Sequence, residues 1–336
     1  LGLYWPWARV RTQRFFLRHT TVAGSSLDYH AVPARLLPRY ALVVGLLGGV
    51  VVAWRGSPLA GLMALSLGLA VMPLVVHVGL IHRMQHTSWA GRRLAFDSQI
   101  EAVYAALLLP LMGIVAVVWL LQAASLRQHP LWWGACGFAA STWLLGVPLF
   151  YWAYFEYRQN RLRMGPVRFL WKADFLSMLM VWGRTVAWLT LMLALVGGAG
   201  AVLLGGVLLA RLPATPGVVA MLLGGALLAV GVAVLPYLQA RLQNLVWSKT
   251  GHRALRFRSQ LSVPDYVMLQ VRHAVLLVLT LGLYWPWAVV ASRRMRAQAL
   301  VIWSRVDADV LKAHLPAYGR DRADFSTYPN HPETRL

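Results

Sequence analysis

The sequence predicts an all-α polytopic membrane protein with six transmembrane helices and one further kinked or re-entrant segment. Composition is the first observation: the 336 residues are 59% hydrophobic and 13% charged, whereas soluble domains usually carry about 25% charged residues. The second is that apolar runs of membrane-spanning length, about 20 residues, alternate with short basic segments. Sixteen tryptophans also suit membrane–water interfaces, where an aromatic ring meets both lipid and water.

Six apolar runs are long enough to cross a bilayer. They are Leu37–Trp54, Leu59–Ile81, Ile100–Leu121, Leu131–Tyr154, Phe175–Ala210 and Val218–Leu238. A seventh run, His273–Ala291, allows two interpretations, because a complete crossing would place the basic C-terminal tail on the opposite face. Residues 281–286 favour a break in this run, so we expect it to be kinked or re-entrant, with the tail inside.

Lysines and arginines are divided unevenly among the connecting segments. Alternate connections are strongly basic, and the short connections between them hold one arginine each. The positive-inside rule therefore predicts that the basic segments face the cytoplasm. Orientation accounts for most of the formal net charge of +21, so we expect no nucleic-acid partner.

An internal repeat organises the basic segments. Residues 1–8 and 281–288 share the sequence LGLYWPWA, and in weaker copies a threonine follows a proline after fourteen residues. Each copy predicts an apolar helix that bends at its proline, continues as a basic arm and ends before a short β-prone hairpin. Several such hairpins are expected to pair into a small cytoplasmic sheet or collar. The prolines expected to bend helices are Pro6, Pro73, Pro148, Pro236 and Pro286.

The chain is expected to form one repeat-containing transmembrane domain, residues 1–303, followed by a polar cytoplasmic tail, residues 304–336. Leu1–Trp7 has the character of the end of an apolar helix, so we expect an upstream membrane segment. The single cysteine, Cys136, excludes a disulfide within the chain and a cysteine metal cluster.

Three stretches resemble a known family: LGLYWPWARVRTQRFFLRHT (1–20), GSSLDYH (24–30) and the second LGLYWPWA. They are similar to the YjgN family of uncharacterised bacterial inner-membrane proteins. The resemblance implies a bacterial inner (cytoplasmic) membrane location and an apolar segment before the first motif. It carries over no catalytic residues, and it suggests a membrane-bound metalloprotease as one partner.

The arms and the membrane edges supply the candidate binding residues. Basic residues of the arms are expected to meet anionic lipid headgroups: Arg9, Arg11, Arg14, Arg18, Arg158, Arg161, Arg293 and Arg294. Polar residues within or at the edge of the membrane form a second set, because such residues are costly there and often functional: His77, His82, Asp97, Glu101 and Arg184.

Each member of the second set has a structural interpretation beside the functional one. His82 and His86 share a helix face at a spacing that can bind metal, but no HExxH glutamate accompanies them, so interfacial histidines are favoured. For Asp97 and Glu101, salt bridges to the arms and placement at a helix N-terminus are favoured over a proton or ion role.

Asp97 and Glu101 are expected at the cytoplasmic edge, near Arg92 and Arg93. Arg184 is expected to snorkel to the headgroups or to pair with Asp174 or Glu156, with an anionic substrate as the alternative.

The sequence contains no Walker motif, serine nucleophile elbow or metal-ligand set. We therefore expect no enzymatic activity, no cofactor and no metal. Two functions are carried forward. One is a scaffold or accessory subunit that holds another membrane protein or a second copy, favoured by glycine-rich helices that permit close packing. The other is a transporter or channel for a small or lipidic solute, favoured by the internal repeat.

Overall fold

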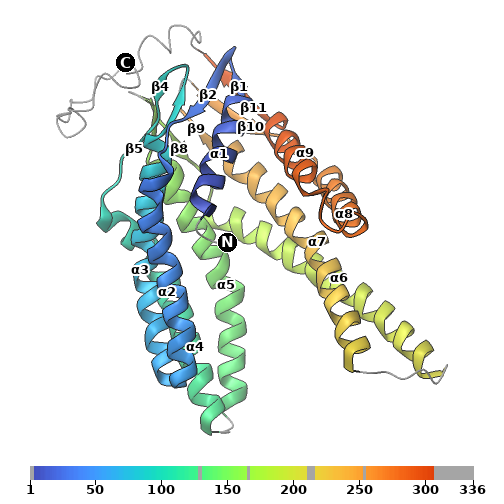
Figure 1. The fold of residues 1–336 in the computed structure, drawn as a ribbon. Coiled ribbons are helices and arrows are strands. Elements are labelled where there is room, and N and C mark those ends of the chain that lie inside the picture. The colour runs from blue at the N-terminus through green and yellow to red at the C-terminus, as the bar shows by residue number, and fades with distance from the viewer. Residues whose placement is uncertain (1–3, 128–130, 165–166, 210–215, 253–254, 306–336) are drawn as a thin grey trace. The chain divides into compact units, whose positions relative to one another are not determined.

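The computed structural model describes residues 4–127, 131–164, 167–209, 216–252 and 255–305 (Figure 1). They fall into two compact units, an N-terminal unit up to Leu170 and a C-terminal unit from Trp171 to Trp303. Within the described residues, six helices are long and apolar enough to span a membrane. The predicted class, a helical multi-pass membrane protein, is confirmed.

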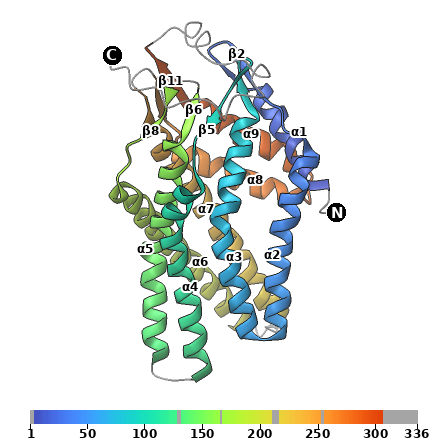
Figure 2. The same ribbon diagram turned by 90° about the vertical axis from the view of Figure 1, so that its left-hand side faces the viewer.

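The N-terminal unit contains five α-helices and seven short strands. Its helices are α1 (Trp5–Arg18), α2 (Leu37–Gly56), α3 (Pro58–Gln85), α4 (Ile100–Arg127) and α5 (Leu131–Asn160), with a 3-10 turn at Pro33–Leu36. Its strands are β1 (Thr21–Val22), β2 (Ser25–Tyr29), β3 (Thr87–Trp89), β4 (Arg92–Arg93), β5 (Ala95–Phe96), β6 (Leu162–Met164) and β7 (Val167–Arg168). The strands gather at one end of helices α2 to α5 (Figure 2).

Strand pairing in this unit joins one basic elbow to the next. We use the word elbow for the end of a helix together with the hairpin that follows it. Strands β1 to β4 form one antiparallel sheet in chain order, in which Tyr29 of β2 lies opposite Thr87 of β3. Strands β5, β6 and β7 form a second sheet, in which Phe96 lies opposite Leu162. The predicted pairing of hairpins from different elbows is therefore observed.

The first two hairpins turn through the same dipeptide. Ala23 and Gly24 have φ values of +48° and +73°, and Ala90 and Gly91 have +50° and +72°. Two successive positive φ values are the geometry of a type I′ turn, whose twist matches that of the flanking strands. The repeated Ala-Gly pair thus forms the same tight turn in both elbows.

The core of the N-terminal unit lies near the elbows. Leu80 of α3, Val103 and Leu107 of α4 and Tyr157 of α5 are buried together with Phe96 of β5. The helices carry many exposed apolar side chains elsewhere, as expected for surfaces that meet hydrocarbon instead of water.

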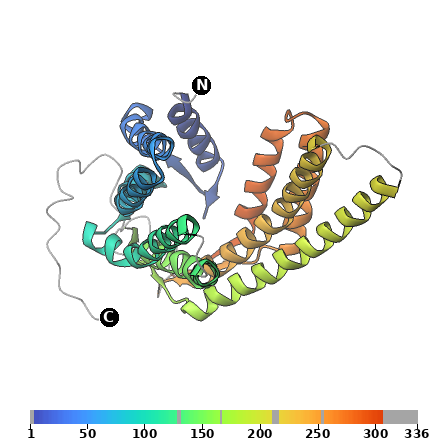
Figure 3. The same ribbon diagram turned by 90° about the horizontal axis from the view of Figure 1, so that it is seen from below.

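The C-terminal unit contains four helices and one four-stranded sheet. The helices are α6 (Phe175–Leu209), α7 (Pro216–Ser248), α8 (Val263–Leu279) and α9 (Trp285–Gln298). The strands are β8 (Leu170–Trp171), β9 (Thr250–Gly251), β10 (Leu255–Ser259) and β11 (Leu300–Ser304), in the sheet order β11-β10-β9-β8. Helices α8 and α9 lie side by side, and α8 packs on α7 (Figure 3).

The seventh apolar run is a helical hairpin. Residues 280–284 separate α8 from α9, with Leu281 and Gly282 at φ values of +51° and +90°. Strand β10 precedes α8 and strand β11 follows α9, and the two strands are neighbours in one sheet. The end of α9 therefore lies near the start of α8. This confirms the predicted break in the seventh run. The predicted start was wrong: the helix begins at Val263, ten residues before His273.

Two of the five prolines expected to bend helices do not do so. Pro6 and Pro286 lie in the first turns of α1 and α9, where a missing N–H has no helical partner to lose. Pro73, Pro148 and Pro236 lie inside α3, α5 and α7, as predicted. The LGLYWPWA sequence thus starts a helix where it was expected to bend one.

Some expectations fall outside the described residues. They concern Leu1 to Leu3 and the polar tail from Val306 onward. The division into a domain of residues 1–303 and a tail of residues 304–336 stays a prediction.

Candidate functional site

The threonines of the repeat end the basic arms. Thr20, Thr87 and Thr250 each donate the hydroxyl to the carbonyl oxygen four residues earlier, at 2.8, 2.7 and 2.6 Å. His19 and His86 precede the first two, and each ring Nδ1 lies 2.7 Å from the carbonyl oxygen four residues before it. These contacts bond side chains to carbonyls in the last turn of each helix, where backbone partners run out, so the repeat marks where each helix stops.

Two arginines of α1 tie this arm to strand β2. The Nε of Arg14 donates to the carbonyl oxygen of Tyr29 at 3.0 Å. Arg18 donates to both carboxylate oxygens of Asp28, at 2.9 and 3.2 Å. A two-pronged bond of this kind fixes orientation as well as distance, so these arginines hold the first elbow together.

The other two candidate arginines of α1 contact aromatic rings. The guanidinium of Arg9 lies 4.9 Å from the ring centre of Trp5, and Arg11 donates to the hydroxyl of Tyr4 at 3.0 Å. Their expected contact with lipid headgroups stays a prediction.

The surroundings of Asp28 favour the ionised form of its carboxyl group. Burial raises the pKa of this carboxyl, but hydrogen bonds from Arg18 and from the backbone N–H of Tyr29 lower it, as do the charges of His30 and Arg18. The sum holds the pKa of Asp28 below its ordinary value. The ion pair with Arg18 therefore persists into moderately acidic solution.

His30 joins the first two elbows. Its ring Nε2 lies 2.9 Å from the hydroxyl of Ser88, and its backbone N–H donates to the carbonyl oxygen of His86 at 2.8 Å. Burial lowers the pKa of His30, and the negative charge of Asp28, which raises it, offsets only part of this effect. The neutral ring is therefore favoured at neutral pH.

A line of hydrogen-bonded polar side chains, with His77 and Tyr157 buried and Ser98 half-buried, connects α3, α5 and the segment before α4. Nδ1 of His77 lies 2.7 Å from the hydroxyl oxygen of Tyr157, which lies 2.8 Å from the hydroxyl of Ser98. The guanidinium of Arg161 lies 5.2 Å from the ring centre of Tyr157. His77 and Arg161 were predicted candidates. Tyr157 and Ser98 were missed, because partners 80 and 59 residues apart leave no spacing signal in the sequence.

His82 and His86 share one face of α3, as their spacing predicts. Their ring centres are 4.1 Å apart, and His82 is buried. The Nε2 of His82 has no hydrogen-bond partner among the described residues. No group of three or more metal-ligating side chains is found in the described ranges.

The carboxylate of Asp97 forms a salt bridge with a basic arm, as predicted. Arg163 of strand β6 lies 2.8 Å from Asp97. Antiparallel pairing of β5 with β6 brings the third elbow beside the second, and this places Arg163 next to Asp97. Glu101 lies exposed in the first turn of α4, where the helix dipole favours a negative charge.

Three further candidate arginines lie on helices at exposed or half-buried positions. Arg158 is half-buried in the last turn of α5, and Arg294 is exposed on α9. Arg184 is exposed on α6 and forms no ion pair with any described residue, so the pairs expected with Asp174 and Glu156 are not observed.

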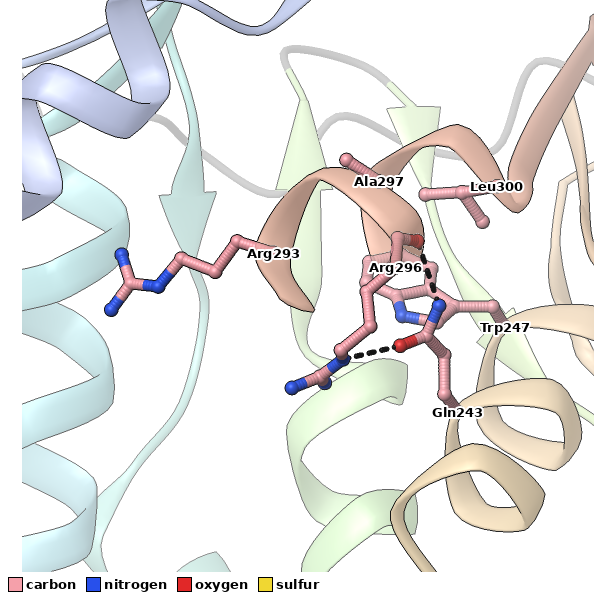
Figure 4. A pocket seen from close by; sticks show the side chains of 6 residues that line it. All are labelled: Gln243, Trp247, Arg293, Arg296, Ala297 and Leu300. Carbon is pink, nitrogen blue, oxygen red and sulfur yellow. Dashed lines mark hydrogen bonds between the residues drawn. The ribbon is translucent and has the colours of Figure 1, made fainter. Parts of the chain in front are cut away.

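A basic pocket of about 230 Å³ lies between α7, α9 and the start of β11 in the C-terminal unit (Figure 4). It is lined by Gln243, Trp247, Arg293, Arg296, Ala297 and Leu300. The buried amide of Gln243 holds Arg296 twice: its oxygen accepts from Nε at 2.6 Å, and its nitrogen donates to the Arg296 carbonyl at 2.8 Å. Desolvation, and then the positive charge of Arg296, lower the pKa of Arg293. Figure 4 shows that the Arg293 side chain is directed away from Gln243, Trp247 and Arg296.

Comparison with known proteins places the chain in a family. A family model described as "Bacterial protein of unknown function (DUF898)" matches residues 1–322. Searches of curated proteins and of solved structures gave no match. The family match includes both LGLYWPWA sequences and every described helix, and it confirms the expectation of an uncharacterised bacterial family. The chain therefore belongs to this family of bacterial proteins of unknown function.

Proposed function

We propose that the chain acts as a non-enzymatic scaffold or accessory subunit of a complex in the bacterial inner membrane, with its basic elbows in the cytoplasm. One observation carries the proposal: strands join consecutive elbows to each other, β2 to β3 and β5 to β6. Ion pairs such as Arg18–Asp28 and Arg163–Asp97 reinforce these elbows. A platform of fixed shape suits the holding of a partner.

The glycines of α2 offer a surface for a partner helix. Gly45 and Gly49 are four residues apart, and a side chain added at either, or at Gly48, would meet no other atom within 4 Å. Helix α2 buries no residue in the described structure. Packing within the described part of the chain does not use these glycines. A transmembrane helix of another protein, or of a second copy, fits this face because small residues permit close approach.

The test is isolation of the full chain from native membranes in mild detergent after crosslinking. We expect a stoichiometric partner, and mass spectrometry will show whether it is a second copy or another membrane protein, such as the metalloprotease suggested by the resemblance. Gly45→Leu should release the partner. Gly79→Leu, at an equally open glycine of α3, should retain it. A monomer with no partner in every preparation contradicts the proposal.

Transport of a small or lipidic solute is the second candidate, and the polar line from His77 through Tyr157 to Ser98 favours it. A protonatable side chain inside a helix bundle is a common element of proton-coupled transport. Liposomes that contain the protein and an enclosed pH dye test this function. Proton flux that disappears in His77→Gln supports it, and flux equal to that of empty liposomes contradicts proton coupling.

A further inference from the structure

The hairpin formed by α8 and α9 carries apolar side chains on its outside. Leu279, Leu281 and Leu283 at its tip are 73%, 94% and 79% exposed, and the exposed rings of Trp285 and Trp287 follow them. Figure 1 shows this tip at the end of the hairpin that lies away from β10 and β11. Proteins in water rarely leave so continuous an apolar patch uncovered, so the tip requires an apolar environment.

Polar side chains lie between the two helices of the hairpin. The amide Nε2 of Gln270 on α8 donates to the hydroxyl of Ser292 on α9 at 2.7 Å, and this hydroxyl lies 3.4 Å from Nδ1 of the buried His273. A helix at the surface of a soluble protein has the reverse arrangement, with its apolar stripe inside and its polar face in water. Polar contacts inside and apolar side chains outside are the pattern expected of a hairpin that hydrocarbon surrounds.

The turn between the helices satisfies its own backbone N–H groups. Those of residues 280–283 and 285 donate to carbonyl oxygens of residues 276–282, at 2.8 to 3.2 Å. The N–H of Tyr284 donates to the hydroxyl of Thr280 at 3.1 Å, and Pro286 has no N–H. An unsatisfied backbone group is costly in hydrocarbon, where no water replaces the missing bond. The donors of this turn therefore do not oppose its entry into a lipid layer.

The uncharged length of the hairpin limits how far it can enter. Residues 273–292 contain no Asp, Glu, Lys or Arg, and Arg272 on α8 and Arg293 on α9 flank them. At a rise of 1.5 Å per residue, the uncharged part of each helix is about 10–12 Å long. The hydrocarbon core of a bilayer is about 30 Å thick. A tip of this length therefore ends within the leaflet from which it enters.

We propose that the tip of the α8–α9 hairpin is inserted into one leaflet of the bilayer, on the side of strands β10 and β11, and that the acyl chains of this leaflet are its partner. Leu279, Leu281 and Leu283 lie among the chains, and the two flanking arginines lie at headgroup level. The insertion holds the sheet of the C-terminal unit at the membrane surface. The proposal does not rest on the scaffold role, because lipid surrounds the hairpin whether or not α2 binds a partner.

The test measures the depth of nitroxide labels on the full chain in lipid nanodiscs, in a Cys136→Ser background. Oxygen concentrates in hydrocarbon and a nickel chelate stays in water, so the ratio of their collision rates with a label reports its depth. Leu281→Cys labels the tip, Val275→Cys the middle of the hairpin and Ala297→Cys the end of α9. Met112→Cys supplies the mid-bilayer reference, because this exposed residue lies near the middle of α4.

We expect the oxygen-to-nickel ratio to rise from Ala297 through Val275 to Leu281 and to stay at or below that of Met112. A Leu281 label that the nickel chelate reaches as readily as the Ala297 label places the tip in water and overturns the proposal. Few collisions with either reagent show that protein covers the tip, which also overturns it.

A complete crossing gives a different result again. The ratio then peaks at Val275 and falls at Leu281, and this outcome contradicts insertion into a single leaflet. If Leu281→Cys does not fold, Leu283→Cys replaces it, because that side chain is also exposed at the tip. None of the labels lies on α2, so failure of this proposal leaves the scaffold proposal to its own test.

Discussion

The imidazole Nδ1 of His77 lies 2.7 Å from the hydroxyl oxygen of Tyr157, and this contact joins α3 to α5 inside the N-terminal unit. Both side chains are buried. The same hydroxyl reaches Ser98 in the segment that leads into α4. One phenol oxygen therefore connects three parts of the helix bundle just below the elbows.

Tyr157→Phe is expected to destabilise the protein. The change leaves the buried nitrogen of His77 without its partner, and an unpaired buried polar group costs about 1–3 kcal/mol. Reversible denaturation of the purified protein in detergent measures the loss. Tyr151→Phe is the matched control on the same helix, because its hydroxyl makes no hydrogen bond to another described residue. Equal stability of both variants would contradict this role for Tyr157.

The Ala-Gly turns predict opposite effects at adjacent positions. Gly91→Ala should lower stability by about 1–2 kcal/mol, the cost of a left-handed backbone for a residue with a Cβ. An added Cβ meets nothing within 4 Å there, so the effect comes from the backbone alone. Ala90→Gly, at a φ of +50°, should leave stability unchanged or raise it. Denaturation midpoints check both signs, and losses in both variants would argue against the type I′ geometry.

The Arg18–Asp28 pair predicts a dependence of stability on acid. The folded pKa of Asp28 lies below its ordinary value of 3.8. The stabilisation is therefore complete above the unfolded pKa and is lost as the pH falls through the folded pKa. Melting temperatures between pH 6 and pH 3 should fall more for the wild type than for Asp28→Asn.

Salt and a second carboxylate provide the controls for that measurement. Added salt should shrink the difference between wild type and Asp28→Asn, because the Arg18 side chain is 57% exposed. Glu101→Gln removes an exposed carboxylate without a salt bridge among the described residues. Because only the helix dipole favours its charge, this change should reduce the slope less than Asp28→Asn does. Identical slopes for wild type and Asp28→Asn would show that the pair does not contribute.

The orientation of the protein is testable with single cysteines in a Cys136→Ser background. Ser26→Cys in β2 and Arg294→Cys in α9 should react with an impermeant maleimide only from the cytoplasmic side. Ser57→Cys, between α2 and α3, should react only from the outer side. All three positions are exposed. Labelling of Ser26→Cys and Arg294→Cys from opposite faces would refute a re-entrant hairpin.

The helices were predictable because hydrocarbon selects long apolar runs, and the elbows because their residues recur. Leu59–Ile81 lies within α3, and the threonine spacing marked helix ends that the hydroxyl contacts of Thr20 and Thr87 now explain. The start of α8 was missed although a signal was present. Pro264 and Asp265 have the pattern of a helix N-terminus, which the apolar run beginning at His273 concealed.

The side-chain partners that join separate elements could not be predicted from the sequence. Asp97 meets Arg163 because strands from two elbows pair, and Gln243 meets Arg296 because a helical hairpin folds back on α7. Neither partner is near its counterpart in the chain, so no local pattern encodes them. The prediction for Pro6 and Pro286 was wrong because the local sequence is ambiguous. An apolar stretch before a proline is compatible both with a helix that bends at the proline and with a helix that begins there.

The pairing of β2 with β3 has a consequence for how the polypeptide is inserted. Two adjacent strands occupy the same side of a bilayer, so the residues between Tyr29 and Thr87 must cross it an even number of times. Pairing of β5 with β6 imposes the same parity on the residues between Phe96 and Leu162. If one helix of either pair failed to insert, the two strands would lie on opposite sides of the bilayer and could not pair. Each sheet can therefore form only when both helices have crossed the membrane.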